Sequence, residues 1–469
     1  MKHSFFFYDL ETSGVDMTCD RIMQFAGQRT NLELKPIGPP VNVLVRLSDD
    51  VLPNPLAIAI TGITPQQASR GMNEAEFVAM LQRDVCTPGT IMTGYNSVRF
   101  DDEFLRYTLY RNLADPYEWA WKDGRARWDL LDVVRMTRAL RPDGIEWPKD
   151  NNGDAVNTLV SLSGANHLVH TRAHDALSDV EALIAMSVLI RKTQPKLFNY
   201  LLKLKDKREV LAVVKPFAPE PFVYTSVMYG RAYGFTTVAV AIGEGENNAV
   251  ITYDLRHDPD LFVDLSEDEL AERIFAKTVD LEAKKQVRPP VKNLHANKCP
   301  AVAPLGTLDA EAATRLDLSL TTVSDHLTKL RASGLVPKLV AAMKLKREYP
   351  PHQDVDGALY DGGFMSDADK QLQAKLRGMP PEDLAEAKPT FADKRLPELF
   401  WRYRARNYPD TLTEGEQALW DTERSARLQG GLKDFTRCYQ GAFEQASPEQ
   451  ASALEDLRLW VESIFPVVD

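Results

Sequence analysis

The sequence predicts a multidomain protein that combines an α/β domain, an α+β domain and a helical domain. The chain has 469 residues, 44% of them hydrophobic, so it can bury several cores, and its length suggests about three domains. The local pattern changes twice, near Gln194-Pro195 and again at Tyr349-Pro350-Pro351. The expected domains therefore span residues 1–195, 196–348 and 352–469.

The first domain alternates between segments typical of strands and of helices. Strands are expected at Phe5–Leu10, Ile22–Thr30, Asn42–Leu47 and Thr90–Tyr95, and helices at Glu74–Val85, Asp101–Leu113, Leu130–Ala139, Thr158–Ser163 and Ala176–Arg191. In the second of these helices, Phe104, Leu105, Thr108 and Leu109 share one face. The mixture is typical of a ribonuclease-H-like sheet flanked by helices.

The two later domains differ in pattern from the first and from each other. After Pro219-Glu220-Pro221, short β-rich segments separated by Gly or Asn turns predict strands at Phe222–Met228, Thr236–Ile242 and Ala249–Leu255. Helical patterns follow at Glu267–Thr278 and Asp309–Ala332, which indicates a small α+β domain with a β core. In the last domain, helices are expected at Ser366–Leu376, Arg395–Arg406, Glu414–Gln429 and Pro448–Ile464.

Composition narrows the class of protein. The net charge of −11 argues mildly against a nucleic-acid partner, although one groove can be basic in an acidic protein. The four cysteines are far apart, which disfavours a disulfide framework or a structural zinc site: Cys19, Cys86, Cys299 and Cys438. The apolar run at the N-terminus is short and ends at Asp9, and no segment approaches ~20 apolar residues. We expect a cytoplasmic protein without a membrane partner.

The strongest chemical signal is an Asp-x-Glu pair at the end of an aromatic run, Phe5-Phe6-Phe7-Tyr8-Asp9-Leu10-Glu11. Side chains alternate along a strand, so both carboxylates lie on one face. Adjacent carboxylates repel each other unless a divalent cation lies between them. The alternative is a solvated strand end, which is common for this motif alone.

Further acids and a base follow along the chain. Asp101 starts a predicted helix, and His174 precedes Asp179 in a His-x4-Asp motif. Asp175 is a good N-cap, so the helix is expected to begin at Ala176 with His174 on the preceding loop. Four carboxylates and one titratable base suit two-metal phosphodiester hydrolysis. We expect Asp9, Glu11 and Asp179 to hold two Mg²⁺ ions, for which Mn²⁺ could substitute, Asp101 to complete the cluster, and His174 to act as general base.

Each of these residues has a plainer interpretation. Asp101 could be one of several acids favoured at a helix N-terminus. Asp179 could be a surface helix residue. A His-x2-His-x3-His cluster of His167, His170 and His174 could bind zinc, although no cysteine lies nearby.

The three motifs, in this order, resemble the DEDDh exonucleases of the DnaQ-like superfamily. Longer segments resemble the bacterial exodeoxyribonuclease I family: 94–103, 127–133, 139–148, 290–300 and 403–407. The resemblance implies a processive enzyme of DNA repair and recombination that removes 5′-mononucleotides from the 3′ end of single-stranded DNA. It also implies nuclease, SH3-like and helical domains, a monomer, and single-stranded DNA-binding protein as a partner.

The resemblance also implies residues that contact DNA: Arg106, Tyr117, Trp121, Arg135, Thr158, Lys207, Asn248, Lys292 and Asn297. Cations for phosphates and aromatic faces for bases are what a single strand requires. Taken singly, any of these charges could be a solvated surface residue. Thr158 departs from the family pattern, which has a basic residue there, so binding of the terminal nucleotide is expected to be weaker or differently arranged.

Two rival functions remain open from the sequence. One is another DEDDh nuclease, for proofreading or RNA trimming, but such chains are mostly a single nuclease domain. The other is a catalytically silent protein that binds single strands. Loss of an acid would indicate the silent protein, and all four acids are present.

Overall fold

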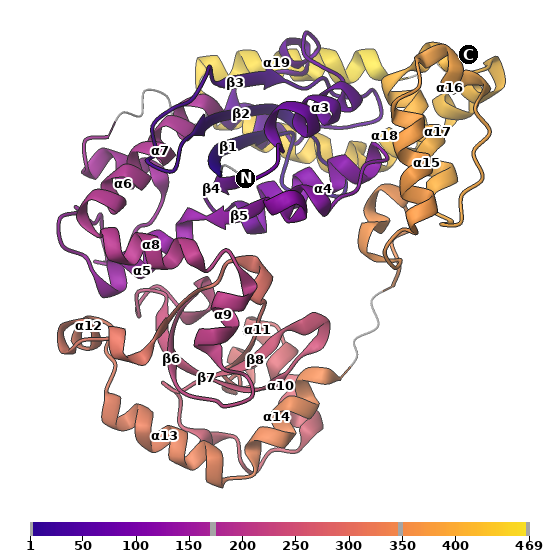
Figure 1. Ribbon diagram of the computed structural model, residues 1–469. Coiled ribbons are helices and arrows are strands. Elements are labelled where there is room, and N and C mark those ends of the chain that lie inside the picture. Colours follow the sequence, from indigo (N-terminus) through magenta and orange to yellow (C-terminus); the bar gives the residue numbers. More distant parts are fainter. Residues whose placement is uncertain (1–2, 169–174, 346–349, 466–469) are drawn as a thin grey trace. The chain divides into compact units, whose positions relative to one another are not determined.

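The computed structural model describes residues 3–168, 175–345 and 350–465 (Figure 1). The chain divides into two compact units. One consists of Met1–Ala126, His170–Ile184 and Pro350–Asp469, and the other of Arg127–Val169 and Ala185–Tyr349. The unit that holds the N-terminal strands therefore also holds the C-terminal helices, and the mixed multidomain fold expected from the sequence is confirmed.

The first unit is built around a strand that is buried along almost its whole length. Its sheet has the order β3-β2-β1-β4-β5, with β1 in the centre and β5 at the edge that leads out of the unit (Figure 1). β2 runs antiparallel to β1 and β4 runs parallel to it. The strands are β1 (Ser4–Thr12), β2 (Ile22–Thr30), β3 (Val41–Leu44), β4 (Thr90–Gly94) and β5 (Ala126–Asp129). The four strands predicted for this region are present, and β5 was not predicted.

The first unit also contains helices from both ends of the sequence. They are α1 (Pro55–Thr61), α2 (Pro65–Ala68), α3 (Glu74–Met80), α4 (Asp101–Arg111), α7 (Ala176–Thr193), α15 (Asp367–Arg377), α16 (Pro381–Glu386), α17 (Leu396–Asn407), α18 (Glu414–Glu444) and α19 (Pro448–Ile464). The helix expected over Glu74–Val85 ends as a π-helical turn at Leu81–Val85.

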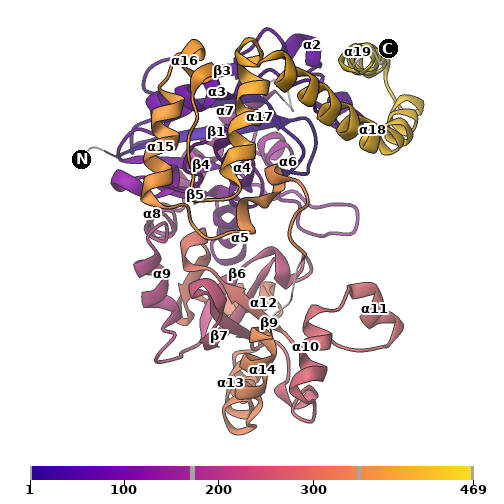
Figure 2. The same ribbon diagram turned by 90° about the vertical axis from the view of Figure 1, so that its right-hand side faces the viewer.

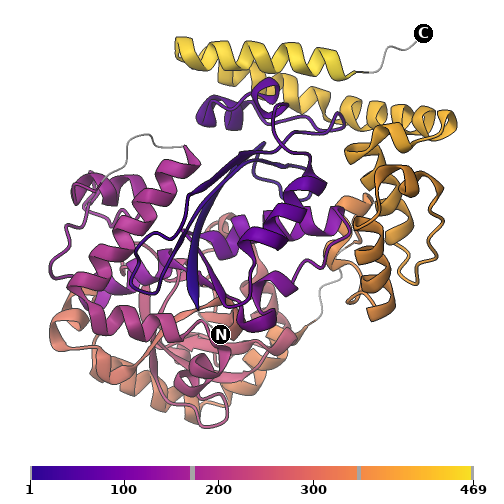
Figure 3. The same cartoon turned by 45° about the horizontal axis from the view of Figure 1, so that its top comes forward.

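Apolar clusters fix the C-terminal helices to the N-terminal part of the first unit. One joins Tyr107 and Tyr110 of α4 to Leu376 of α15 and Leu399 of α17, and Figure 2 shows α15 and α17 side by side. Another joins Ile58 of α1 to Leu454, Leu457 and Val461 of α19, which lies against α18 (Figure 3). These clusters make the C-terminal helices part of the body that carries β1.

Helix α18 is longer than the sequence pattern predicts, because it continues beyond Gln429 to Glu444. Gly430 and Gly431 lie inside it, and glycine usually weakens a helix interior. A Cβ at Gly431 would lie 3.0 Å from the side chain of Leu52, so the missing side chain lets α18 approach that segment closely. Tertiary packing therefore outweighs the local propensity.

The second unit contains an antiparallel sheet with the order β10-β6-β7-β8-β9. Its strands are β6 (Phe222–Thr225), β7 (Thr236–Glu244), β8 (Val250–Asp254), β9 (Val291–Leu294) and β10 (Ala301–Pro304). Its helices are α5 (Leu130–Leu140), α6 (Leu159–Ala165), α8 (Pro195–Lys203), α9 (Lys207–Val214), α10 (Glu267–Phe275), α11 (Thr278–Ala283), α12 (Ala310–Arg315), α13 (Leu320–Ala332) and α14 (Leu335–Lys344).

The helix expected over Glu267–Thr278 ends earlier, at Phe275 of α10, because Ala276 and Lys277 are extended, and α11, which begins at Thr278, was not predicted. The helix expected over Asp309–Ala332 is divided into α12 and α13. Between α12 and α13, Asp317 has a positive φ of 50°, and Ser319 caps the new helix by accepting from the Thr322 amide. A side-chain cap inside a helical pattern is a start signal, and here it overrides the periodicity.

No helix within the described ranges is long and apolar enough to cross a membrane. In the described part of the chain no disulfide forms among the four cysteines, as the sequence predicts.

Candidate active site

Three of the predicted acids meet where β1 ends. Asp9 and Glu11 lie two residues apart on the central strand, and Asp179 lies in the first turn of α7. One carboxylate oxygen from each lies within 4.8 Å of the others. This is close enough for a single divalent ion to contact all three, since its oxygen ligands lie ~2.0–2.6 Å away.

The start of α7 explains how Asp179 reaches this position. Asp175 Oδ1 accepts a hydrogen bond from the Leu177 amide at 3.1 Å, and the Asp175 carbonyl accepts one from the Asp179 amide at 3.0 Å. The helix therefore begins at Ala176, as the sequence predicts. Val180 is fully buried in the same turn and fixes the helix rotation. His174, the predicted base, lies outside the described residues.

Asp101 lies beside this set but does not belong to it. It begins α4 and is buried, yet its carboxylate is not among the three that share the 4.8 Å limit. Its negative charge nevertheless contributes to raising the pKa of both Asp9 and Glu11. The Tyr8 hydroxyl donates to Asp102 Oδ1 at 2.5 Å, which holds the start of α4 against β1.

Burial and neighbouring negative charge disfavour the ionised forms of Asp9 and Glu11. Burial, and then the charges of Asp101, Glu11 and Asp179, raise the pKa of Asp9 well above its ordinary value. Burial, followed by Asp179, Asp101 and Asp175, raises the pKa of Glu11 to about 8. A solvated strand end would not behave in this way, and Glu11 is only 9% exposed.

A bound cation would offset this effect, because positive charge favours the ionised carboxylates. The ligand atoms are all oxygens, which suits Mg²⁺ or Mn²⁺ better than a soft metal. Among the described residues this is the one group of three or more acidic, histidine or cysteine side chains close enough to hold an ion. His167 of the alternative zinc cluster has a positive φ of 52°, and His170 and His174 lie outside the described residues.

Three predicted DNA contacts lie in the first unit. Arg106 donates to Glu103 Oε1 at 2.5 Å and lies over the Tyr117 ring, 5.6 Å from its centroid. Tyr117 in turn makes an edge contact with Phe364 at 5.4 Å. Trp121 is 63% exposed, which leaves its ring available for stacking. A cation and an aromatic ring therefore lie together at Arg106 and Tyr117.

Two further predicted contacts, in the second unit, are more buried than a solvated charge would be. Arg135 is 8% exposed, pairs with Asp132 at 2.8 Å and lies over the Phe235 ring at 4.5 Å. The Lys292 ammonium lies 4.6 Å from the centroid of Tyr224. Neighbouring side chains therefore fix the positions of Arg135 and Lys292.

The remaining predicted contacts are exposed positions of the second unit: Thr158, Lys207, Asn248 and Asn297. Thr158 is the N-cap of α6, and its hydroxyl donates to Ser161 Oγ at 2.8 Å. Lys207 is the first residue of α9. Asn248 has a positive φ of 59°, and the Asn297 carbonyl accepts from Arg127 at 3.1 Å.

The sequence pattern did not reveal Phe364 and Tyr360, which contact Tyr117 and Arg106 from the C-terminal segment. It also did not reveal Arg21, which is buried next to the loop that follows Glu11. These partners are distant in sequence, so no local signal connects them.

Comparison with known proteins covers the whole chain. Family models described as Exonuclease, Exonuclease I SH3-like domain and Exonuclease I C-terminal domain match residues 6–186, 205–344 and 353–464. Exodeoxyribonuclease I of Haemophilus influenzae is 41% identical over 460 residues, which cover 97% of each chain. The crystal structure of Escherichia coli exonuclease I in complex with a dA16 oligonucleotide matches with a TM-score of 0.93 and 38% identity, covering 99% of this chain and 100% of that one.

A second structure from the same organism, the zinc-ion-bound form of its complex with single-stranded DNA, matches with the same TM-score of 0.93, identity of 38% and coverage of 99% and 100%. The identity and coverage of these relatives, together with the acid cluster at the end of β1, show that the chain belongs to the exodeoxyribonuclease I family.

Proposed function

We propose that this chain hydrolyses single-stranded DNA from its 3′ end, processively, and releases 5′-mononucleotides. The observation that carries the proposal is the convergence of Asp9, Glu11 and Asp179 within 4.8 Å on a buried strand end. The family supplies the substrate class, since its relatives are exodeoxyribonucleases and the Escherichia coli enzyme was crystallised with single-stranded oligonucleotides.

The proposed cofactor is a pair of Mg²⁺ ions, for which Mn²⁺ could substitute. When bound, such ions lower the pKa of a water and stabilise the charge that develops on the phosphate. The oxygen-only donor set and the raised pKa of Asp9 support hard divalent cations here. The zinc-bound structure of the Escherichia coli enzyme further supports a divalent site in this family.

Each acidic residue has a proposed task. Asp9, Glu11 and Asp179 hold the ions and keep them at the strand end. Asp101 adds negative charge from the start of α4 and so favours cation binding. His174 is the proposed general base, because an imidazole with an ordinary pKa near ~6.5 can take a proton from water near neutral pH.

In the proposed DNA-binding surface, cations contact the phosphates of the single strand and aromatic rings stack on its bases. In the first unit the proposed contacts are Arg106, Tyr117 and Trp121; in the second unit the proposed contacts are Arg135, Thr158, Lys207, Asn248, Lys292 and Asn297. The proposed domains are a nuclease domain over 1–195, an SH3-like domain over 196–348 and a helical domain over 352–469, and the three matched family segments support this division.

We propose that the protein is a cytoplasmic monomer of DNA repair and recombination that binds single-stranded DNA-binding protein. The family resemblance implies that an acidic tail of this partner docks on a pocket, and a cavity of about 540 Å³ in the second unit is the candidate. Lys203 lines it beside apolar Leu204, Val213 and Leu305. Glu209 and Glu220 also line it, and Glu220 pairs with Lys215 at 2.6 Å. A Lys203→Glu variant should bind a tail peptide more weakly, as isothermal titration calorimetry would measure.

One digestion experiment separates the proposed function from its rivals. Single-stranded DNA, double-stranded DNA and single-stranded RNA, each end-labelled, are incubated with wild type and with Asp9→Ala in Mg²⁺ or in EDTA. The proposal predicts mononucleotides from the 3′ end of single-stranded DNA in Mg²⁺ alone, and an Asp9→Ala variant that binds without cutting. Preferred cutting of RNA would indicate an RNA-trimming nuclease, and binding without cutting by the wild type would indicate a silent binding protein.

A further inference from the structure

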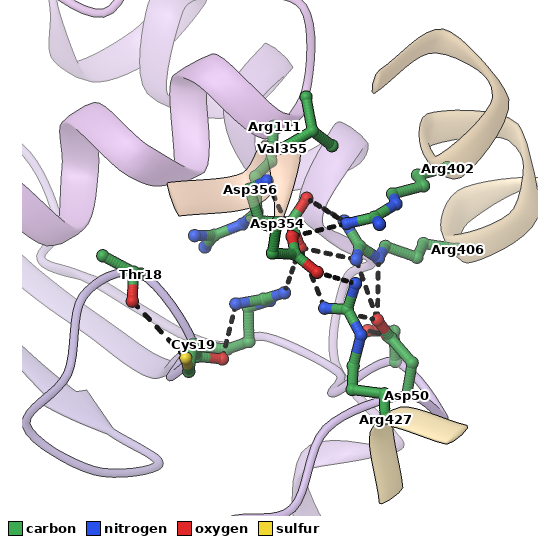
Figure 4. Close-up of polar contacts among 12 residues, drawn as sticks. Thr18, Cys19, Asp50, Arg111, Asp354, Val355, Asp356, Arg402, Arg406 and Arg427 are labelled. Atoms are coloured by element: carbon green, nitrogen blue, oxygen red, sulfur yellow. Dashed lines mark hydrogen bonds and ion pairs between the residues drawn. The ribbon is translucent and has the colours of Figure 1, made fainter. Parts of the chain in front are cut away.

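A buried network of ion pairs in the first unit joins the loop after Glu11 to the C-terminal segment. Its centre is Asp356, which is 1% exposed. The carboxylate accepts hydrogen bonds from Arg21 at 3.0 Å, from Arg406 at 2.6 and 3.0 Å, and from Arg427 at 3.2 Å, and it pairs with Arg402 at 3.3 Å. Figure 4 shows the arginines Arg402, Arg406 and Arg427 around it.

Arg21 is the member of this network that reaches toward the active site. Its guanidinium is 1% exposed and also donates to the carbonyl of Cys19 at 2.6 Å and of Asp20 at 3.2 Å. Its backbone pairs with Ser13: the Ser13 amide donates to the Arg21 carbonyl at 2.8 Å, and the Arg21 amide donates to Ser13 Oγ at 2.9 Å. Ser13 follows Glu11 by two residues.

The loop from Ser13 to Arg21 is tightly packed. Ser13 Oγ donates to Asp20 Oδ1 at 3.1 Å, and a Cβ at Gly14 would lie 2.2 Å from the same carboxylate. The pairing of β1 with β2 shifts register between Glu11 and Thr12, so the regular ladder ends at the metal-ligand candidate. Beyond that point, the loop and its anchors determine where the strand end lies.

We infer that Asp356 and Arg21 are positioning residues for Glu11: the buried ion pair fixes the loop that follows the strand, and the loop fixes the carboxylate. The inference deepens the proposed function and rests on it. It gives the C-terminal segment a part in building the active site, through a residue 335 positions away from Arg21 in the chain.

The Asp356 carboxylate stays ionised, so its ion pairs do not depend on pH. Burial alone would raise the pKa of Asp356, but Arg406, Arg21 and Arg402 outweigh burial and hold the pKa well below its ordinary value. The carboxylate therefore stays ionised at any pH at which the protein would work. Removing its charge leaves the buried guanidinium of Arg21 without its nearest carboxylate, since the next one, of Glu74, lies 3.8 Å away, and such a loss destabilises a fold strongly.

The test compares Asp356→Asn with Asp354→Asn. Asp354 is the control, because it pairs with Arg402 and Arg427 at 2.7 Å in the same network and does not accept from Arg21. Its side chain is 46% exposed, and asparagine keeps the oxygen that accepts from the Asp356 amide at 2.8 Å. Electron paramagnetic resonance measures Mn²⁺ affinity without DNA, and steady-state digestion gives kcat and KM separately. Substituting a residue that orients a metal ligand directly weakens metal binding by about 10–100-fold. Substituting a residue that acts through a loop should therefore weaken Mn²⁺ binding by about 3–10-fold.

The inference predicts that Asp356→Asn weakens Mn²⁺ binding by that factor and lowers kcat, with KM for DNA unchanged, while Asp354→Asn changes neither by more than about twofold. If Asp356→Asn does not fold, Ser13→Ala is the second variant. It removes the hydrogen bonds of Ser13 Oγ with the Arg21 amide and with Asp20, and it leaves the ion pairs and the bond from the Ser13 amide to the Arg21 carbonyl intact. It should weaken Mn²⁺ binding in the same direction. The inference is overturned if both variants bind Mn²⁺ as tightly as the wild type. It is also overturned if Asp356→Asn does not fold and Ser13→Ala binds Mn²⁺ as tightly as the wild type. In either case the proposed function still stands. A wild type that binds no Mn²⁺ overturns both.

Discussion

The raised pKa of Glu11 makes the stability of the metal-free protein depend on pH in a predictable way. The pKa rises from an ordinary value of 4.5 to about 8. Each pH unit of such a difference is worth 1.36 kcal/mol, so the full effect is about 5 kcal/mol. Below pH 4.5 the side chain is protonated in both the folded and the unfolded chain, and the effect is absent.

The sign follows from proton binding. Between pH 4.5 and about 8 the folded protein holds a proton on Glu11 that the unfolded chain has lost. Raising the pH therefore favours the unfolded chain, by about 1.4 kcal/mol per pH unit. Above pH 8 the destabilisation is complete, unless a cation binds and compensates the charge.

Glu11→Gln removes this titration while keeping the size of the side chain. In EDTA, the free energy of unfolding of the variant minus that of the wild type should increase by about 3 kcal/mol from pH 5 to pH 7.5, at about 1.4 kcal/mol per pH unit. Urea denaturation followed by tryptophan fluorescence at several pH values measures it. Glu33→Gln, at an exposed position of the same unit, is the control.

Saturating Mg²⁺ should stabilise the wild type at pH 7.5 much more than the variant, because binding to the folded state adds stability by mass action. A difference between variant and wild type that stays constant from pH 5 to pH 8 would refute the reasoning, since Glu11 would then titrate as a solvated acid.

Three further predictions concern the site and the DNA-binding surface. Asp9→Asn should lower kcat by about 10³-fold, the equivalent of several kcal/mol of lost metal assistance, while single-strand binding measured by anisotropy persists; a wild-type rate would contradict this. Trp121→Ala should raise the Kd for single-stranded DNA by about 5–100-fold through lost stacking worth ~1–3 kcal/mol, and an unchanged Kd would exclude Trp121 from that surface. Thr158→Arg should steepen the dependence of log Kd on log salt by about 0.7 if the position faces a phosphate, and an unaltered slope would place it elsewhere.

The parts of the site that depend on local rules could be predicted from the sequence. Alternation along β1 places Asp9 and Glu11 on one face, and the Asp175 cap sets the start of α7 and hence the place of Asp179. The strands β1, β2, β4, β6, β7 and β8 also follow from short-range patterns. Their confirmation reflects signals contained within about ten residues.

Features that depend on distant contacts could not be predicted. No local signal in the sequence singles out Arg21 or Asp356, yet each is 1% exposed and the two side chains pair at 3.0 Å. Helix α18 continues through Gly430 and Gly431, and the close approach of Leu52 to Gly431 is a tertiary contact without a local signal. Asp101 was expected to complete the acidic cluster, and the distance at which α4 holds it beside Asp9, Glu11 and Asp179 is fixed only by tertiary structure.

A crystal grown with Mn²⁺ tests the central claim most directly, because anomalous scattering locates the ion without assumptions about the protein. We predict a peak about 2.0–2.3 Å from carboxylate oxygens of Asp9, Glu11 and Asp179. An empty strand end with the ion bound elsewhere would contradict the claim that these three acids form the metal site.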